Sequence, residues 1–240
     1  MADNYLSDLF EAENLPLTEH QYNQFQTYYE LLSQRNQVMN LTAITDWKDV
    51  CIKHFLDSVM LWKNEGLGFN EEMQLRMVDV GTGAGFPGLP LKIMKPEIHL
   101  TLLDALQKRI DFLDDVVRAC GLSDVETVHG RAEDVVKTCR ESFDLAVSRA
   151  VAYLPVLSEY CLPFVKTGGV FAAYKSGDIE EELKASEYAW STLGGKLEKT
   201  DRFVLPDGSA RSIILIRKEK ETPEKYPRRP KKIEKEPLVG

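Results

Sequence analysis

The 240-residue sequence predicts an α/β fold in which helices surround a mostly parallel sheet. Three observations support this prediction. Short apolar runs alternate with helical patterns from about residue 75 onward, a glycine-rich turn follows the first run, and no helix separates the last two runs. Parallel strands need crossover helices between them, whereas two consecutive strands can pair as a hairpin. The sheet is therefore expected to end in an antiparallel hairpin.

Helices are expected before the sheet begins. Thr18 and Gln21 have the spacing of a capping box, a pair of residues that satisfies free backbone N–H groups at the start of a helix. Aromatic and aliphatic residues then recur at helical spacing, and a second helical stretch covers residues 47–62. We therefore expect a helical extension over residues 1–66 that packs on the sheet domain.

The sheet domain, residues 67–221, is expected to contain seven strands. The first five strands are expected at 75–80, 98–104, 125–129, 143–148 and 169–175. The helices are expected at 89–94, 106–119, 131–139, 153–165 and 179–192. The last two strands, 199–206 and 212–218, flank a turn at Asp207-Gly208.

The composition is that of a soluble globular protein, with 43% hydrophobic and 28% charged residues. No apolar run approaches the roughly 18 to 20 residues that a membrane span needs, and the N-terminus has no signal-peptide pattern. The cysteines are too far apart to predict zinc binding or a disulfide framework. They are Cys51, Cys120, Cys139 and Cys161. We expect a cytoplasmic protein with no metal and no membrane partner; a monomer is favoured, and the sequence leaves the oligomeric state open.

Charge is distributed unevenly along the chain. Residues 217–240 carry nine Lys/Arg and five Asp/Glu, while the whole chain has a net charge of −8. A basic tail on an acidic body suggests a polyanionic partner, although a tail that is merely solvated explains the pattern equally simply. The tail from residue 222 to 240 is rich in Pro, Lys and Glu, so it is predicted to be extended and mobile.

The stretch VDVGTGAGFPGLP, residues 78–90, places four glycines between a strand and a helix. Glycines gather where the backbone takes positive φ or approaches a ligand closely, and a helix N-terminus offers free N–H groups. Dinucleotides, nucleoside triphosphates and S-adenosylmethionine (SAM) all bind at such turns. A triphosphate-binding Walker loop is excluded because no Gly-Lys-Ser/Thr follows.

Three features favour SAM over a nicotinamide cofactor, although G-x-G-x-x-G and an acid at Asp104 would suit either. Asp79, two residues before Gly81, would repel a pyrophosphate but can order the turn around the methionine part of SAM. No tyrosine is followed by Lys four residues later, as short-chain oxidoreductases require. Residues 162–170 read as a helix, a Gly-Gly turn and a strand, as in methyltransferases. These features predict the Rossmann-like fold of class I SAM-dependent methyltransferases.

The expected cofactor contacts lie at strand ends, where open α/β sheets bind ligands. The backbone at Gly81, Gly83 and Gly85 would close on the amino-acid portion of SAM. Asp104 would accept hydrogen bonds from both ribose hydroxyls. Ala132-Glu133 would meet the adenine, although Glu133 could equally be an acid that favours the helix dipole.

Together these motifs resemble the RsmG family, also called glucose-inhibited division protein B, over nearly the whole chain. The motifs are Asn40-Leu41-Thr42, His54-Phe55-Leu56-Asp57-Ser58, Asp79 to Ile93, Asp104 to Arg109, Arg131-Ala132-Glu133, Ser148-Arg149-Ala150 and Tyr174-Lys175. Members are methyltransferases of small-subunit ribosomal RNA. One departure is Arg35, which stands where an aromatic residue is expected. It leaves the cofactor site intact.

The resemblance implies methyl transfer from SAM to N7 of a guanine in the 530 loop of 16S rRNA, at conventional position 527. By matching positions it implies that the SAM site is lined by Gly81, Phe86, Ala132, Glu133 and Arg149. The partner would be 16S rRNA or a small-subunit particle. Whether naked rRNA, a precursor particle or the mature subunit is the substrate stays open.

Other polar residues are candidates for the substrate site. His54, Asp57 and Ser58 share one helical face, either as part of the RNA site or as a helix-packing cluster. Lys175 would pair with an RNA phosphate or with a nearby carboxylate. No catalytic base is expected, because N7 of guanine carries a lone pair and no proton.

Three alternatives remain: a small-molecule methyltransferase, an RNA-binding factor that keeps SAM only structurally, and the disfavoured nicotinamide oxidoreductase.

Overall fold

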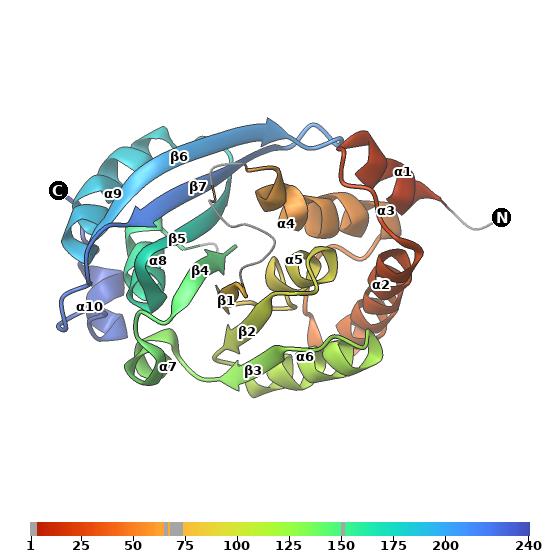
Figure 1. Cartoon of the computed structure of the whole chain (residues 1–240), viewed down its shortest axis with the longest axis horizontal. Helices are drawn as coiled ribbons and strands as arrows, with labels where there is room; N and C mark the ends of the chain where they lie inside the picture. The colour runs from red at the N-terminus through yellow and green to blue at the C-terminus, as the bar shows by residue number, and fades with distance from the viewer. Residues whose placement is uncertain (1–3, 65–66, 68–73, 150–151) are drawn as a thin grey trace.

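The computed structural model describes residues 4–64, 67, 74–149 and 152–240. Its centre is a seven-stranded sheet with the order β3-β2-β1-β4-β5-β7-β6 (Figure 1). The strands are β1 Arg76–Val80, β2 His99–Asp104, β3 Val125–His129, β4 Phe143–Ser148, β5 Val165–Ser176, β6 Gly195–Val204 and β7 Ala210–Lys218. Strands β1 to β5 pair in parallel, and β7 runs antiparallel to both β5 and β6. The predicted mostly parallel sheet with its closing hairpin is confirmed.

Helices cover both faces of the sheet (Figure 1). The N-terminal elements are α1 Tyr5–Ala12, α2 Glu19–Met39, α3 Trp47–Val50, η1 Cys51–Leu56, α4 Asp57–Val59 and η2 Met60–Lys63. The later ones are α5 Gly88–Met94, α6 Gln107–Ala119, α7 Ala132–Cys139, α8 Leu154–Cys161, η4 Leu162–Phe164, α9 Glu180–Leu193 and α10 Pro230–Lys235. The predicted capping box is present, since Thr18 Oγ1 accepts from Gln21 N at 3.2 Å and Gln21 Oε1 accepts from Thr18 N at 2.9 Å.

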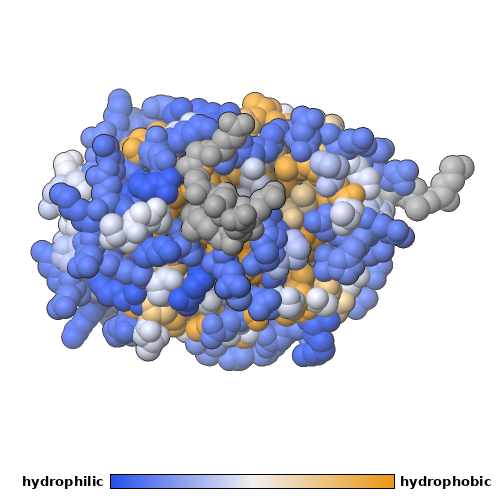
Figure 2. Space-filling model, viewed as in Figure 1, coloured by the Kyte–Doolittle hydropathy of each residue, from blue (hydrophilic) through white to orange (hydrophobic). Residues whose placement is uncertain are grey.

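Two apolar cores flank the sheet. One contains side chains from α1, α2, η1, α5 and α6 together with the sheet residues Met77, Leu102 and Leu145. The other lies between the opposite face and α7, α8 and α9. The N-terminal extension is therefore a layer of the same packed unit. In the view of Figure 2, hydrophilic residues cover most of the surface, and apolar residues show mainly toward the N-terminal helices.

The stretch predicted as one helix over residues 47–62 is irregular. It passes from α-helix through a π-helical turn, η1, to a second short α-helix and a 3₁₀ turn. The spacing of hydrophobic residues does not reveal these changes, because α-, π- and 3₁₀-helical turns differ in which backbone carbonyl accepts from each N–H group. π-helical turns occur often at functional sites, and this one carries His54.

Strand β5 begins earlier than predicted. The expected helix over 153–165 ends at Cys161, and the Gly168-Gly169 turn lies inside β5, beside a register shift against β4. A Cβ on Gly169 would lie 2.6 Å from the carbonyl oxygen of Asp144, so the close approach of two strands requires glycine there. Strand β6 likewise begins at Gly195 instead of residue 199.

The prediction of an extended tail over residues 222–240 is wrong. Residues 230–235 form α10, and Thr222, Tyr226, Ile233 and Leu238 are buried. These side chains, three of them large, let a Pro- and Lys-rich segment pack on the domain. The overall composition of the segment does not reveal them, because they are few among many polar residues. Within the described ranges, no helix is both long and apolar enough to span a membrane. The four cysteines are free, and three of them are buried.

Candidate functional site

Asp79 organises the glycine turn from inside the protein. Its Oδ2 accepts from Thr82 Oγ1 at 2.7 Å and from Gly88 N at 2.8 Å, so one carboxylate ties both ends of the turn to β1. Its Oδ1 is buried and, within the described part of the chain, has no hydrogen-bond partner. Burial raises the pKa of Asp79 to about 7. The predicted ordering role of this acid matches these contacts.

The glycines of the turn have two different structural roles. Gly81 and Gly83 have φ of +73° and +64°, and a Cβ on either would meet open space. Gly85 has φ of +100°, and its Cβ would lie 2.5 Å from Leu89 Cδ1 and 2.6 Å from the Tyr28 hydroxyl. The first two therefore leave room for a ligand, whereas Gly85 permits close packing against the helical extension.

Asp104 ends β2 at the same edge of the sheet. Its carboxylate accepts hydrogen bonds from the backbone N–H of Gly83 at 3.0 Å and of Leu106 at 2.9 Å. Arg109 Nη1 lies 3.1 Å from Oδ2. These contacts hold Asp104 in place, and the residue lines a cavity.

This cavity, the glycine-turn pocket, measures about 280 Å³ and lies at the carboxyl ends of β1 and β2. Its lining includes Gly81, Asp104, Ala132, Glu133, Ala152, Tyr160, Pro230 and Glu234. Four of these residues were predicted for the cofactor. Glu133 also lies in the first turn of α7, so its position agrees with the dipole role as well.

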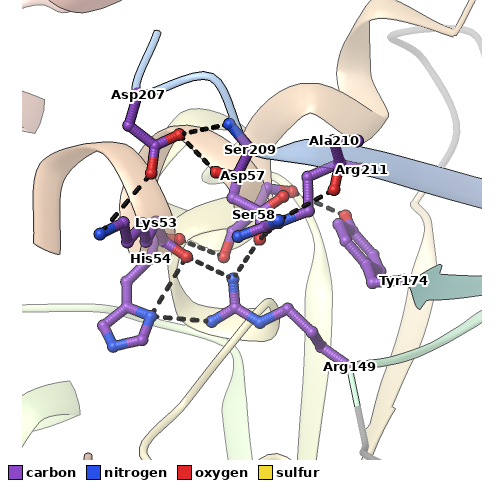
Figure 3. Close-up of polar contacts among 10 residues, drawn as sticks. All are labelled: Lys53, His54, Asp57, Ser58, Arg149, Tyr174, Asp207, Ser209, Ala210 and Arg211. Carbon is purple, nitrogen blue, oxygen red and sulfur yellow. Dashed lines mark hydrogen bonds and ion pairs between the residues drawn. The ribbon is translucent and has the colours of Figure 1, made fainter. Parts of the chain in front are cut away.

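A second and larger cavity, the arginine pocket, measures about 720 Å³. Its lining includes His54, Asp57, Arg149, Ala152, Tyr174, Lys175 and Arg211. Arg149 follows the last residue of β4 and reaches toward η1 and α4 (Figure 3). Ala152 lines both pockets, so the two cavities lie next to each other at this residue.

Arg149 connects the polar groups of the arginine pocket. Its guanidinium donates to Asp57 Oδ2 at 3.0 Å and to the Lys53 carbonyl at 3.2 Å, and it lies 3.4 Å from His54 Nδ1 (Figure 3). Arg211, from β7, lies 3.5 Å from the same carboxylate oxygen. Asp57 Oδ1 has no hydrogen-bond partner among the residues that the structure describes. The nearly buried carboxylate thus holds two arginines and keeps one oxygen unused.

Burial and charge set the protonation of this cluster. Burial, followed by the positive charge of Arg149, lowers the pKa of His54 to about 3. The imidazole is therefore neutral at physiological pH. Burial raises the pKa of Asp57, while Arg149 and Arg211 oppose that shift.

Stacked rings join the helical extension to the turn. Phe86 stacks on His54, with 4.5 Å between ring centroids and an interplanar angle of 21°. It also stacks on Tyr28 from α2, at 5.3 Å. The guanidinium carbon of Arg149 lies 5.1 Å from the Phe86 centroid. Phe86 therefore supports the arginine pocket.

The structure shows which neighbours contact the residues whose roles the sequence left open. Ser58 Oγ donates to the His54 carbonyl, which is the helix-packing alternative, whereas His54 and Asp57 both reach Arg149. Lys175 pairs with a carboxylate, that of Glu182 at 2.5 Å, and also donates to the Ala152 carbonyl at 2.6 Å. It therefore holds Ala152, which lines both pockets.

Several lining residues were missed by the sequence analysis. They are Ala152, Tyr160, Tyr174, Arg211, Pro230 and Glu234. Tyr174 belongs to the Tyr174-Lys175 motif, in which only Lys175 was assigned a role. Arg211 follows the hairpin turn, a position that could have identified it as lying at the strand-end edge. Pro230 and Glu234 carried no usable signal.

Comparison with known proteins identifies the family. The family model described as rRNA small subunit methyltransferase G, GidB, matches residues 21–213. The ribosomal RNA small subunit methyltransferase G of Lachnoclostridium phytofermentans is 48% identical over 94% of this chain and 93% of its own. The protein of that name from Staphylococcus aureus is 46% identical over 100% of this chain and 99% of its own.

Solved structures agree on the fold. The TYW2 protein of M. jannaschii, in complex with AdoMet, has a TM-score of 0.51 at 16% identity, covering 68% of this chain and 76% of that one. The YcgJ protein of Bacillus subtilis has a TM-score of 0.53 at 14% identity, covering 70% and 100%. The predicted class I SAM-dependent methyltransferase fold is confirmed. The chain belongs to the GidB family, the rRNA small subunit methyltransferases G.

Proposed function

We propose that this chain transfers a methyl group from SAM to N7 of a guanine in 16S rRNA, with SAM in the glycine-turn pocket and the guanine in the arginine pocket. Membership of the family supports an rRNA substrate, and the resemblance of the motifs supports N7 and position 527. One observation carries the assignment of the pockets. Two cavities of different chemistry lie next to each other at Ala152, at the carboxyl edge of the sheet.

SAM fits the glycine-turn pocket from the methionine end to the adenine end. Gly81 leaves space for the amino-acid portion next to the ordered turn. Asp104 accepts hydrogen bonds from the ribose hydroxyls, a task that suits a carboxylate with several acceptor positions. Ala132 and Glu133 lie beyond Asp104, where the adenine follows the ribose. When bound, SAM supplies an electrophilic methyl group at the junction of the pockets.

The arginine pocket suits an unstacked base in an RNA loop. Arg149 and Arg211 offer positive charge to phosphate or to a carbonyl oxygen, and Phe86 and His54 form a stacked support behind Arg149. Asp57 contacts both arginines through Oδ2 and so helps to fix them at the wall of this pocket.

The protein contributes positioning to this reaction. The N7 lone pair attacks the methyl carbon as the carbon–sulfur bond breaks, so the positive charge moves from sulfur to the guanine. No proton has to be removed before the attack. Alignment of the nucleophile, methyl and sulfur within near-attack distance can supply roughly 7 to 11 kcal/mol. His54, which lines this pocket, is a weak base because burial lowers its pKa to about 3.

The assay uses tritiated SAM with three substrates: 16S rRNA, a precursor particle and the mature small subunit, each prepared without the methyl group. We expect label at N7 of guanine 527 in at least one of them. Binding of rRNA without any transfer would support an RNA-binding factor instead. Transfer only to small molecules would support the remaining methyltransferase alternative.

We expect the single-turnover rate at saturating SAM and rRNA to be nearly independent of pH between about 6 and 9. His54 stays deprotonated throughout this range, since its pKa of about 3 lies well below it. A log-linear rise with slope one that disappears in His54→Gln or Asp57→Asn would establish a base. An inflection near pH 7 that disappears only in Asp79→Asn would reflect titration of the turn carboxylate.

A further inference from the structure

The C-terminal segment, residues 222–238, is fastened to the domain by charged side chains. Arg140, just after α7, donates to three of its backbone carbonyls: Thr222 at 2.7 Å, Pro223 at 3.1 Å and Tyr226 at 2.8 Å. A single guanidinium therefore fixes the path of the chain as it leaves the sheet. Such contacts need one defined backbone conformation and are not those of a merely solvated tail.

A buried ion pair fixes the segment further along. Glu159 of α8 is completely buried. Arg228 Nε and Nη2 donate to its two oxygens at 2.9 and 2.6 Å, and the backbone N–H of Arg228 donates at 2.8 Å. A buried carboxylate without its partner is costly, so Glu159 strongly favours the seated segment. The position of α10 is thus built into the fold.

This anchoring places two residues of α10 at the glycine-turn pocket. Pro230 and Glu234 line it together with Ala132, Glu133 and Tyr160. The electrostatics agree with that placement. After burial, the negative charges of Glu133 and Glu234 are the next largest causes that raise the pKa of Tyr160, to about 12. Both carboxylates therefore lie near one hydroxyl at this end of the pocket.

We propose that the C-terminal segment is the outer wall of the adenosine site, with Pro230 packing against the adenine ring and Glu234 accepting a hydrogen bond from the 6-amino group. The proposal rests on the placement of SAM given above. The 6-amino group is a donor without a charge, and a carboxylate is a pure acceptor, so the two are complementary. The segment lies outside residues 21–213, the range that the family model matches.

The segment also carries exposed lysines, Lys231, Lys232 and Lys235, which could contact rRNA phosphates instead. The wall is favoured because Pro230 and Glu234 line a cavity with Asp104, whereas none of these three lysines is among the residues that line it. The two possibilities predict that different variants are defective. Substitutions of Pro230 or Glu234 test the wall, and substitutions of the lysines test contact with rRNA.

The test is calorimetry on the full chain with S-adenosylhomocysteine and with its 6-oxo analogue, S-inosylhomocysteine. The wild type should prefer the adenosine compound. Glu234→Gln should weaken its binding about tenfold, the cost of one hydrogen bond to a charged group, and reduce the preference, because an amide serves either edge. Pro230→Ala should weaken both compounds. The control Lys231→Gln, on the same helix, should bind both as the wild type does.

The proposed wall would be rejected if Glu234→Gln and Pro230→Ala bound S-adenosylhomocysteine with unchanged affinity and had wild-type melting temperatures. A retained preference for the adenosine compound in Glu234→Gln would also reject it. Weaker rRNA binding in Lys231→Gln combined with normal cofactor binding in Glu234→Gln would assign the segment to RNA. Failure of the wild type to bind S-adenosylhomocysteine at all would instead reject the placement of the cofactor.

Discussion

Replacing Asp104 with alanine should raise the dissociation constant for SAM by roughly a hundredfold or more. Two charge-assisted hydrogen bonds to the ribose would be lost, each worth about 1.5 to 3 kcal/mol. The substitution also removes the acceptor for the Gly83 and Leu106 N–H groups and the partner of Arg109. The turn therefore loses its support from β2 together with the ribose contact. Calorimetry with SAM measures the change.

Two further variants separate these effects. Asp104→Asn keeps an acceptor oxygen and the shape, so it should weaken SAM binding less than alanine does. Asp111→Ala, an exposed acid on α6 that contacts Gln107, is the matched control and should leave affinity unchanged. An unchanged dissociation constant in a folded Asp104→Ala protein would remove this residue from the cofactor site.

Gly85→Ala should lower the free energy of unfolding by about 2 to 5 kcal/mol. A left-handed conformation costs an L-residue roughly 1 to 2 kcal/mol, and overpacking a core costs about 1 to 3 kcal/mol more. The new methyl group would lie 2.5 Å from Leu89 Cδ1 and 2.6 Å from the Tyr28 hydroxyl. Tyr28 is buried and donates to the Ala84 carbonyl, so it has little freedom to yield. Denaturant unfolding measures the loss.

Gly83→Ala is the matched control because it has a positive φ of +64° but open space around its Cβ. It should lose only the conformational part, roughly 1 to 2 kcal/mol, while impairing SAM binding. Equal losses of stability in the two variants would show that packing against the helical extension does not constrain the turn.

Much of the sheet was predictable because its information is local. Alternating strand and helix patterns predicted the parallel strands, and the missing helix before β7 predicted the hairpin. The glycine turn and the acids at 79 and 104 predicted one pocket, since strand ends converge at one edge. The family resemblance added Phe86 and Arg149 to the expected SAM site, whereas the structure places Arg149 in the arginine pocket with Phe86 stacked behind it.

The remainder depends on contacts between distant residues. The arginine pocket joins Asp57, Arg149 and Arg211 through an irregular helix whose π turn leaves no mark in the hydrophobic spacing. The seating of the tail depends on the pair of Glu159 and Arg228, 69 residues apart. The average composition of the segment predicts that it is solvated, whereas its position depends on the buried carboxylate of Glu159.

The glycine-turn pocket is lined by residues that are synthesised at different times. Gly81 and Asp104 are translated early, whereas Pro230 and Glu234 follow all seven strands. Chains fold progressively as they emerge, so the sheet can assemble before its pocket is walled. A ligand stabilises only the state that binds it. If SAM binds as proposed, the sheet forms before this pocket is complete, and the full stabilisation by the cofactor follows the docking of α10.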